Sequence, residues 1–319
     1  MWKSGLHGDI SDVPGILTGH AHDLDALTGV TAVVTLGGAV VGVAVEGSAP
    51  GTRETDLCRP GNLVGAAHAI LLCGGSAFGL AAADGAMRYL AEREIGFPTG
   101  VVPVPIVPAA VLFDLGIGRP DVRPDSAMGY AACASAAGGP VARGCVGAGA
   151  GCTAGKALGP ENATKTGIGS SSVVLTGGII VGAIIAVNAF GDVWEGDRII
   201  AGPRLPGGAG YADTTRLLLD GPGAGAPGTN TTIGVVAVGG RLTKEEASKV
   251  ARMAHDCLAR TISPLHTMFD GDTLFCLATG GEAVDVSAAG TAAAIAVKLA
   301  VLDAVRSATA AGGLPAGGL

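Results

Sequence analysis

The sequence predicts an α/β protein, a sandwich with helices lying outside packed sheets. Strand and helix patterns alternate as β-α-β-α through the last third of the chain, an order typical of this class. Apolar residues make up 48% of the chain, but aromatic residues only 3%, and 55 of the 319 residues are glycine. Such elements pack through small side chains at short distances. The length suffices for a substantial core, and we expect a single domain.

The first predicted sheet elements lie between residues 31 and 46. Here "TAVVTLGGAVVGVAVE" contains two runs rich in β-branched residues joined at Gly37-Gly38, a pattern typical of a hairpin. The apolar periodicity of residues 62–72 then indicates a helix. A second helix is predicted from Ser76, its expected N-cap, to about Glu94.

The middle of the chain contains a proline-rich segment and a second strand pair. Residues 101–115 are rich in β-formers but carry three prolines, which favours a sheet edge or an irregular pocket wall. Residues 171–194 follow a strand, Gly-Gly, strand form. The second arm is apolar throughout, so we expect it to be covered on both faces. This places Asn188 at the end of a buried strand.

The C-terminal part follows a stretch rich in proline and glycine, residues 196–230, which is predicted as a linker. A capping box formed by Thr243 and Glu246 predicts a helix start. The predicted elements are a strand at 232–238, this helix, a strand at 273–277 and a last helix at about 286–308.

Composition excludes several classes of function. A net charge of −7 with 20 scattered basic residues disfavours nucleic-acid binding. No run of about 20 apolar residues is present, so we expect no membrane span. The N-terminus lacks a secretory signal pattern, and a cytoplasmic protein is the default expectation. Seven cysteines without a C-x-x-C pair favour buried, reduced thiols. No metal is expected, since the histidines lack ligand spacing and are interpreted as structural: His20, His22, His68, His255 and His266.

A possible nucleophile stands where the glycine-proline run meets a strand, in "GPGAGAPGTNTTIGVVAV". A threonine hydroxyl needs an adjacent base, and an N-terminal threonine supplies one through its own α-amine. Cleavage between Asn230 and Thr231 would create that amine, and a flexible loop before a rigid strand suits such an event. The plainer interpretation is a loop before a strand that begins with β-branched residues.

Paired carboxylates occur in "MFDGDTLF", where Asp270 and Asp272 stand two apart just before a strand. In strand geometry both side chains would face one side, and close carboxylates titrate together. The pair could therefore orient an amine that moves protons. The alternative is an Asp-Gly turn with exposed carboxylates.

Two lysines are candidates for stabilising an oxyanion. Lys156 lies in the glycine-rich stretch "GAGAGCTAGKALG", which fails the phosphate-loop pattern because Ala157 replaces the hydroxyl residue. A lysine held among small residues can instead polarise a reacting group. Lys165 in "ATKTGIG" is a second candidate for the same role, and an ordinary loop lysine is the alternative for either.

Several stretches together resemble the DmpA-type aminopeptidase family of self-cleaving N-terminal-nucleophile hydrolases. They include "APGTRETDL", "HAILLCGGSAFGLAAADGAMRYL", "VPIVPAAVLFDLGIG", "GAGAGCTAGKALG", "AVNAFGDV", "TNTTIGVVA" and "MFDGDTLFCLAT". The resemblance covers residues 19 to 308 in order. It implies the layered αββα sandwich of that family, with cleavage into a large chain (1–230) and a small chain (231–319).

The resemblance also implies roles for individual residues. Thr231 would be the nucleophile and, through its α-amine, the base, while Asn230 would become a new C-terminus. Asn188 matches the family's helper asparagine, and Lys156 matches its lysine. Phe113 stands at the substrate-binding wall where other members have a tyrosine, so that hydroxyl donor is missing.

The residues after the nucleophile refine the implied function. Asp270 and Asp272 match the two-aspartate form of the nylon-oligomer hydrolase branch, where they would orient the amine and receive a substrate ammonium. The expected activity is hydrolysis of amide bonds in short peptides or amino-acid oligomers, without a cofactor. A homo-oligomer, a tetramer of cleaved heterodimers, is also implied. The alternative is an acyltransferase of the glutamate N-acetyltransferase type, which would pass the acyl group from threonine to an amine.

Overall fold

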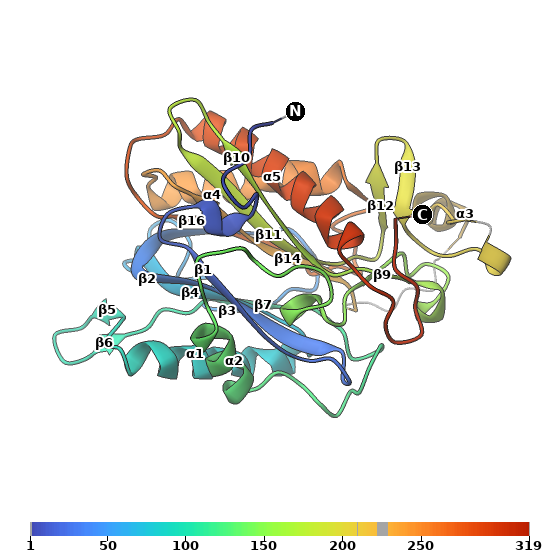
Figure 1. The fold of residues 1–319 in the computed structure, drawn as a ribbon, viewed down its shortest axis with the longest axis horizontal. Helices are drawn as coiled ribbons and strands as arrows, with labels where there is room; N and C mark the ends of the chain where they lie inside the picture. The colour runs from blue at the N-terminus through green and yellow to red at the C-terminus, as the bar shows by residue number, and fades with distance from the viewer. Residues whose placement is uncertain (1, 209, 222–228, 319) are drawn as a thin grey trace.

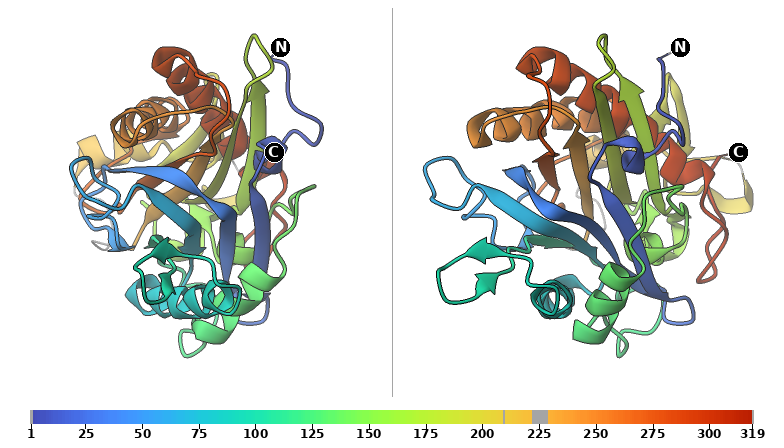
Figure 2. Two further views of the ribbon diagram at one scale, coloured as in Figure 1. Left: turned by 90° about the vertical axis from the view of Figure 1, so that its left-hand side faces the viewer. Right: turned by 60° about the vertical axis from the view of Figure 1, so that its left-hand side comes forward.

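The computed structural model describes residues 2–208, 210–221 and 229–318. Within these residues nine strands form one hydrogen-bonded sheet in the order β10-β11-β14-β16-β2-β4-β7-β3, with β1 beside β2. The sheet folds over so that its two halves form the inner layers of a four-layer sandwich (Figures 1 and 2). The strands are β1 (Leu17–Asp23), β2 (Thr28–Val45), β3 (Gly51–Arg53), β4 (Ala66–Cys73), β7 (Ala109–Val111), β10 (Ile168–Val174), β11 (Ile180–Asn188), β14 (Thr231–Val238) and β16 (Thr273–Ala278).

Helices cover both outer faces of this folded sheet. On one side α4 (Lys244–Ala259) packs on β2 and β16, and α5 (Val286–Arg306) packs on β10 and β11. On the other side α1 (Ala82–Ala91) and α2 (Ser126–Ala134) pack on each other and on β4, β1 and β2. The predicted αββα sandwich is thus confirmed.

Three apolar clusters fill the spaces between the layers, and the strands alternate between them. In β14, Ile233 and Val235 face the cluster between the sheet halves, whereas Val236 and Val238 face α4 and α5. Every residue of β14 is buried. The strand that begins at Thr231 is therefore held rigidly from both faces.

The predicted hairpin at residues 31–46 is wrong, because the whole segment is one strand, β2. The ladder to β4 is interrupted between Val34 and Ala39, where Gly38 adopts φ +75°. The Gly-Gly pair therefore makes a bulge that bends the strand instead of reversing it. The first half of β2 pairs with β1 and β4, and the second half pairs with β16, so this single strand joins the two inner layers.

The helix predicted at residues 62–72 is also wrong, since β4 occupies this segment. Its side chains alternate between two apolar clusters: Leu72 packs between the sheet halves and Leu71 packs toward α1. Because both faces of β4 are buried, the strand is apolar at consecutive positions. The next helical segment is confirmed as η2 (Ser76–Ala81) followed by α1. Ser76 does not cap it, because Gly75 is the N-cap residue and no side chain accepts a hydrogen bond there.

The C-terminal elements agree with their predictions. Thr243 and Glu246 form both bonds of the capping box of α4. The predicted final helix is α5, which is long and apolar enough to cross a membrane by composition alone. However, 67% of its most apolar stretch is buried inside the protein, as in the core helix of a folded domain.

Residues 196–230 are more ordered than the linker prediction allowed. They contain β13 (Arg198–Ala201), η5 (Pro206–Gly208) and α3 (Thr214–Asp220). The buried Asp192 accepts hydrogen bonds from the Thr214 N–H (2.8 Å) and hydroxyl, and Asp213 caps α3. The centre of the glycine-proline loop, residues 222–228, lies outside the described residues.

The remaining elements are short and surround the ends of the large sheet. The 101–115 segment forms an irregular wall as predicted, with β7 inside the sheet next to its edge strand β3. The short strands and turns are β5 (Phe97–Pro98), β6 (Pro103–Val104), β8 (Thr153–Ala154), β9 (Thr164–Lys165), β12 (Asp192–Glu195), β15 (Ile262–Ser263), η1 (Ile10–Asp12), η3 (Gly147–Gly149) and η4 (Pro160–Asn162).

Candidate active site

Thr231 is the first residue of β14 and lies between the ends of two neighbouring elements. In the antiparallel ladder of β11 and β14 its partner is Asn188, the last residue of β11. On the other side, Asn230 pairs with Asp270 just before the parallel strand β16. Asn230 is 1% exposed and Thr231 is 4% exposed. The topology thus brings four of the sequence-predicted site residues to one end of the sheet.

The carbonyl group of Asn230 is held by a backbone donor on the β16 side. The Gly271 N–H donates to the Asn230 oxygen at 3.0 Å, and the Asn230 N–H donates to the Phe269 oxygen at 3.2 Å. The Thr231 hydroxyl also donates to the Asn230 oxygen, so it lies against the carbonyl group of its own preceding peptide. The backbone of residues 269–271 therefore holds Asn230 at both its N–H and its carbonyl oxygen.

Gly271 has no room for a side chain at this point. A Cβ atom would lie 2.5 Å from the Ala49 oxygen and 3.0 Å from the Thr231 Oγ. The close approach of the Gly271 backbone to the nucleophile candidate thus requires glycine. Sequence reasoning missed this residue, although the Asp-Gly-Asp spacing placed it between the two predicted carboxylates.

Asn188 and Lys156 form a pair beside Thr231. The Lys156 ammonium donates to the Asn188 side-chain oxygen at 2.9 Å and to its backbone oxygen at 3.1 Å. The Asn188 Oδ1 also accepts from the Thr153 N–H at 3.1 Å, while its Nδ2 donates to the Phe113 carbonyl at 2.8 Å. Burial lowers the pKa of Lys156 to about 7, because removal from water disfavours the charged amine.

Lys165 lies apart from this pair. It is fully buried, and its ammonium donates to the backbone oxygens of Gly149 (3.2 Å) and Thr166 (2.6 Å). Those two bonds join the end of η3 to the residue that follows β9. Of the two lysines left open by the sequence, the structure therefore brings Lys156 to Asn188, the ladder partner of Thr231.

Asp270 and Asp272 are both buried, and each of their four carboxylate oxygens accepts a hydrogen bond. Asp270 accepts from the Phe190 N–H (3.2 Å) and from the Thr267 N–H and hydroxyl (3.1 and 2.5 Å). Asp272 accepts from the Thr232 N–H at 2.7 Å, and its other oxygen accepts from His266. Burial, together with the charge of Asp272, raises the pKa of Asp270 to about 6.

These bonds bear on two expectations from the sequence. The exposed Asp-Gly turn is wrong, since burial and bonding enclose both carboxylates. The expected contact with a substrate ammonium stays a prediction, and in this structure the carboxylates accept from Phe190 and Thr267 (Asp270) and from Thr232 and His266 (Asp272). His266, interpreted from the sequence as structural, is a further residue of this cluster.

A cavity of about 420 Å³ opens beside Asn230 and Lys156. Phe113 lines it, as predicted, together with Asp114, a residue that sequence reasoning did not select. Asp114 is 4% exposed, accepts from Thr28 Oγ (2.8 Å) and the Gly75 N–H (2.7 Å), and has a pKa raised by burial. The remaining walls are both apolar and polar: Gly116, Ile117, Gly151, Thr153, Pro160, Glu161, Thr229, Gly312 and Leu314.

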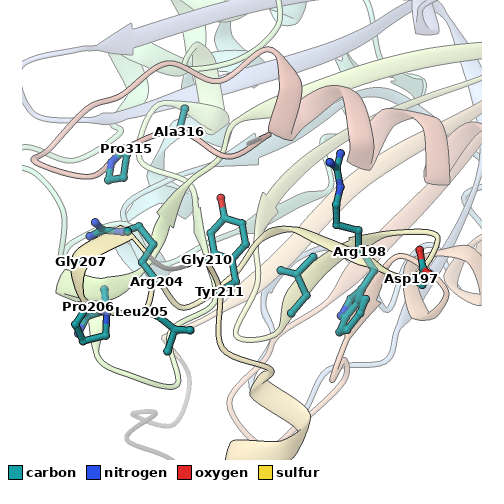
Figure 3. A pocket seen from close by; sticks show the side chains of 14 residues that line it. Asp197, Arg198, Arg204, Leu205, Pro206, Gly207, Gly210, Tyr211, Pro315 and Ala316 are labelled. Carbon is teal, nitrogen blue, oxygen red and sulfur yellow. The ribbon is translucent and has the colours of Figure 1, made fainter.

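A larger cavity of about 780 Å³ lies against β12 and β13 and shares no lining residue with the first (Figure 3). Arg204 and Tyr211 line it beside the C-terminal residues Pro315 and Ala316. It contains none of the predicted site residues. Within the described residues, no group of three or more His, Cys, Asp or Glu side chains is placed to hold a metal ion.

Comparison with known proteins connects this geometry to a family. The model of peptidase family S58 matches residues 8–316. An uncharacterized aminopeptidase of Mycobacterium tuberculosis is 42% identical over 96% of both proteins. A 6-aminohexanoate-oligomer endohydrolase of Agromyces sp. is 28% identical, over 93% of this chain and 82% of that protein.

Solved structures show the same fold at low sequence identity. A beta-aminopeptidase of Burkholderia sp. has a TM-score of 0.72 at 24% identity, covering 100% of this chain and 92% of the other. The L-aminopeptidase D-Ala-esterase/amidase of Ochrobactrum anthropi, described as a variant of the Ntn hydrolase fold, has a TM-score of 0.72 at 18% identity, covering 97% and 88%.

Fold and relatives together define an amidohydrolase, an enzyme acting on C–N bonds, with an Ntn-hydrolase fold. The chain belongs to peptidase family S58.

Proposed function

We propose that the protein is a self-cleaving N-terminal-threonine amidohydrolase. The observation that carries the proposal is the position of the Asn230–Thr231 peptide. Its carbonyl oxygen accepts the Gly271 N–H, and the Thr231 hydroxyl lies against it. Lys156 and Asn188 stand on one side of Thr231, and the two aspartates stand on the other.

Self-cleavage would begin with attack of the Thr231 Oγ on the Asn230 carbonyl carbon. The new C–O bond replaces the C–N bond, so the chain passes through an ester and the nitrogen becomes the Thr231 α-amine. The Gly271 N–H supports the developing charge on the Asn230 oxygen. Water then hydrolyses the ester, giving a new carboxyl terminus at Asn230.

In the cleaved enzyme the same hydroxyl would attack an amide of the substrate. The α-amine of Thr231 accepts the hydroxyl proton and passes it to the leaving amine, and water releases the acyl group in a second step. Lys156 stabilises the substrate oxyanion as a hydrogen-bond donor. Asn188 acts through Lys156, because its own amide nitrogen is bonded to the Phe113 carbonyl.

The cavity beside Asn230 supports short peptides or amino-acid oligomers as substrates. Its apolar residues Phe113, Ile117 and Leu314 suit a hydrocarbon segment, and two carboxylates, Asp114 and Glu161, suit an amine end. The names of the relatives, aminopeptidases and a 6-aminohexanoate-oligomer endohydrolase, fall in this range of amides.

Mass spectrometry of the purified protein tests the proposal directly. We expect two chains of 230 and 89 residues in the wild type, and amide hydrolysis only after cleavage. Thr231→Ala should give one uncleaved, inactive chain, and Thr231→Ser should still be cleaved because serine keeps the hydroxyl. Thr279→Ala is a matched control, since Thr279 contacts the far end of β14 through the Val238 oxygen. A fully active, uncleaved wild type would refute the proposal.

A further inference from the structure

We propose that His266 is a positioning residue of this enzyme: it holds the Asp272 carboxylate so that Asp272 fixes the peptide N–H that follows the nucleophile. The inference rests on the proposed function, because it assigns His266 a part in both self-cleavage and hydrolysis. His266 lies in the loop between β15 and β16, six residues before its partner. No feature of its sequence neighbourhood distinguished it from the other histidines.

The two carboxylate oxygens of Asp272 accept hydrogen bonds from different residues. Oδ1 accepts from the Thr232 N–H at 2.7 Å, next to the nucleophile. Oδ2 accepts from the His266 Nδ1 at 2.8 Å and from the His266 backbone N–H at 3.2 Å. A carboxylate without a proton can only accept a hydrogen bond, so the tautomer of His266 that fits this contact carries its proton on Nδ1. His266 thus fixes one end of the carboxylate while the other end holds β14.

The backbone of His266 is adapted to this double contact. Its φ is +56°, in the left-handed region that residues other than glycine seldom occupy. This conformation brings its backbone N–H and its imidazole N–H onto a single oxygen atom. Unfavourable backbone geometry of this kind is kept where the surroundings require it, often at functional sites.

The ring of His266 packs against a second histidine, His255. His255 in α4 packs edge-to-face on it with 5.0 Å between ring centroids. His255 itself is buried, and its Nε2 lies 3.3 Å from the Ala44 oxygen in β2. The imidazole therefore has a fixed orientation, whereas the Asp272 side chain alone could rotate about its own bonds.

Asp272 needs such a constraint because Asp270 lies close to it. The charge of one carboxylate contributes to the raised pKa of the other, so the two repel when both are ionised. Without His266, rotation of Asp272 away from Asp270 would also release the Thr232 N–H. The first residues of β14 would then be less well fixed, and the Thr231 hydroxyl and amine would no longer be held in a defined position relative to Lys156.

The test measures the rate of self-cleavage and the kcat and KM of the cleaved enzyme in His266→Ala, His266→Asn and His266→Gln. An Asn side chain places an N–H near the position of Nδ1, whereas Gln places its N–H near Nε2. We expect His266→Ala and His266→Gln to lower kcat about 10- to 100-fold with KM nearly unchanged, because a misplacement of about 1 Å at the reacting groups can cost about 100-fold in rate. His266→Asn should restore most of the rate.

A double-mutant cycle shows whether His266 acts through Asp272. If it does, Asp272→Asn combined with His266→Ala should be no slower than Asp272→Asn alone. His68→Ala is the control, because His68 in β4 likewise makes a hydrogen bond through Nδ1, but it accepts the Ile106 N–H at 3.2 Å and does not contact Asp272. It should be cleaved and hydrolyse at the wild-type rate.

Three results would overturn the inference: a wild-type rate in His266→Ala, equal rates in the Asn and Gln variants, or multiplicative effects in the cycle. If His266→Ala does not fold, the comparison of Asn with Gln decides alone. Failure of the proposed function looks different, because the wild type and His68→Ala would then both remain uncleaved and inactive.

Discussion

Lys156 and Asn188 are joined at two points: the Lys156 ammonium donates to both the side-chain and the backbone oxygen of Asn188, at 2.9 and 3.1 Å. Asn188 is in turn the ladder partner of Thr231. Two hydrogen bonds to the last residue of β11 thereby hold the Lys156 ammonium next to the ladder partner of the nucleophile candidate.

Replacing Lys156 by Met should remove the oxyanion donor and leave the aliphatic packing. We expect amide hydrolysis to fall on the order of 10²- to 10³-fold, the usual cost of losing such a donor. Turnover of a chromogenic aminoacyl amide, measured on cleaved enzyme, checks this. Activity within about twofold of the wild type would rule out the donor role.

The same variant should also change how stability depends on pH. The pKa of Lys156 is about 7 in the folded protein, below the 10.5 of a free lysine, so between these values the unfolded chain binds more protons. The free energy of unfolding of the wild type should therefore rise with pH through this window. Lys156→Met should lack this rise. Urea unfolding of uncleavable Thr231→Ala chains, with and without Lys156→Met, at pH 6 and pH 9 measures the difference.

Replacing Asn188 by Asp should shift the pH dependence of the reaction. A carboxylate would then stand at the position of the Asn188 oxygen, 2.9 Å from the Lys156 ammonium. An opposite charge at this distance favours the charged amine, so the pKa of Lys156 should rise. If the charged amine is the donor, the alkaline limb of the pH–rate profile moves to higher pH, and if the neutral amine takes part, the acid limb does. An unchanged profile would show that the protonation of Lys156 does not control the rate.

The bend of β2 gives a prediction about stability. Gly38→Ala introduces a side chain at φ +75°, although its nearest neighbours, Ala66 Cβ at 3.6 Å and His68 Nε2 at 3.7 Å, leave room for a methyl group. The cost is therefore one of backbone conformation, about 1–2 kcal/mol in the free energy of unfolding. Gly37→Ala is the control, because no atom lies within 4 Å of the added methyl group. Equal stabilities in denaturant unfolding would contradict the bulge.

The bend and β4 also show why parts of the fold could not be predicted from the sequence. Two β-branched runs around Gly37-Gly38 carry the same local signal whether the chain reverses or only bends, and the strand partners decide between them. The short apolar run of β4 fits a buried strand as well as a helix. Where the signal was a specific side-chain pairing, as in the capping box of α4, the prediction was confirmed.

The same distinction applies to the candidate site. Lys156, with Lys165 as its alternative, and the two aspartates were candidates from their residue types, whereas Asn188 was assigned by the family resemblance. The fold brings Asn188 and Asp270 to the start of β14, with Lys156 bonded to Asn188. The Gly271 N–H was missed because a backbone donor has no signature in the sequence. His266 was missed because its contact with Asp272 depends on a left-handed backbone that the sequence does not show.

Gly271 provides the sharpest test of the self-cleavage geometry. In Gly271→Ala the added methyl group would lie 2.5 Å from the Ala49 oxygen and 3.0 Å from the Thr231 Oγ, so the loop must move and the N–H leaves the Asn230 oxygen. In the proposed mechanism that N–H stabilises the developing oxyanion, so self-cleavage should slow about 10²- to 10³-fold. Gly65→Ala is a suitable control, since an added methyl group there meets no atom within 4 Å. The fraction of cleaved chain is followed on a denaturing gel after synthesis. If the alanine variant were cleaved as fast as the control, the donor could not be this backbone group, and the oxyanion would have to be held from the Lys156 side instead.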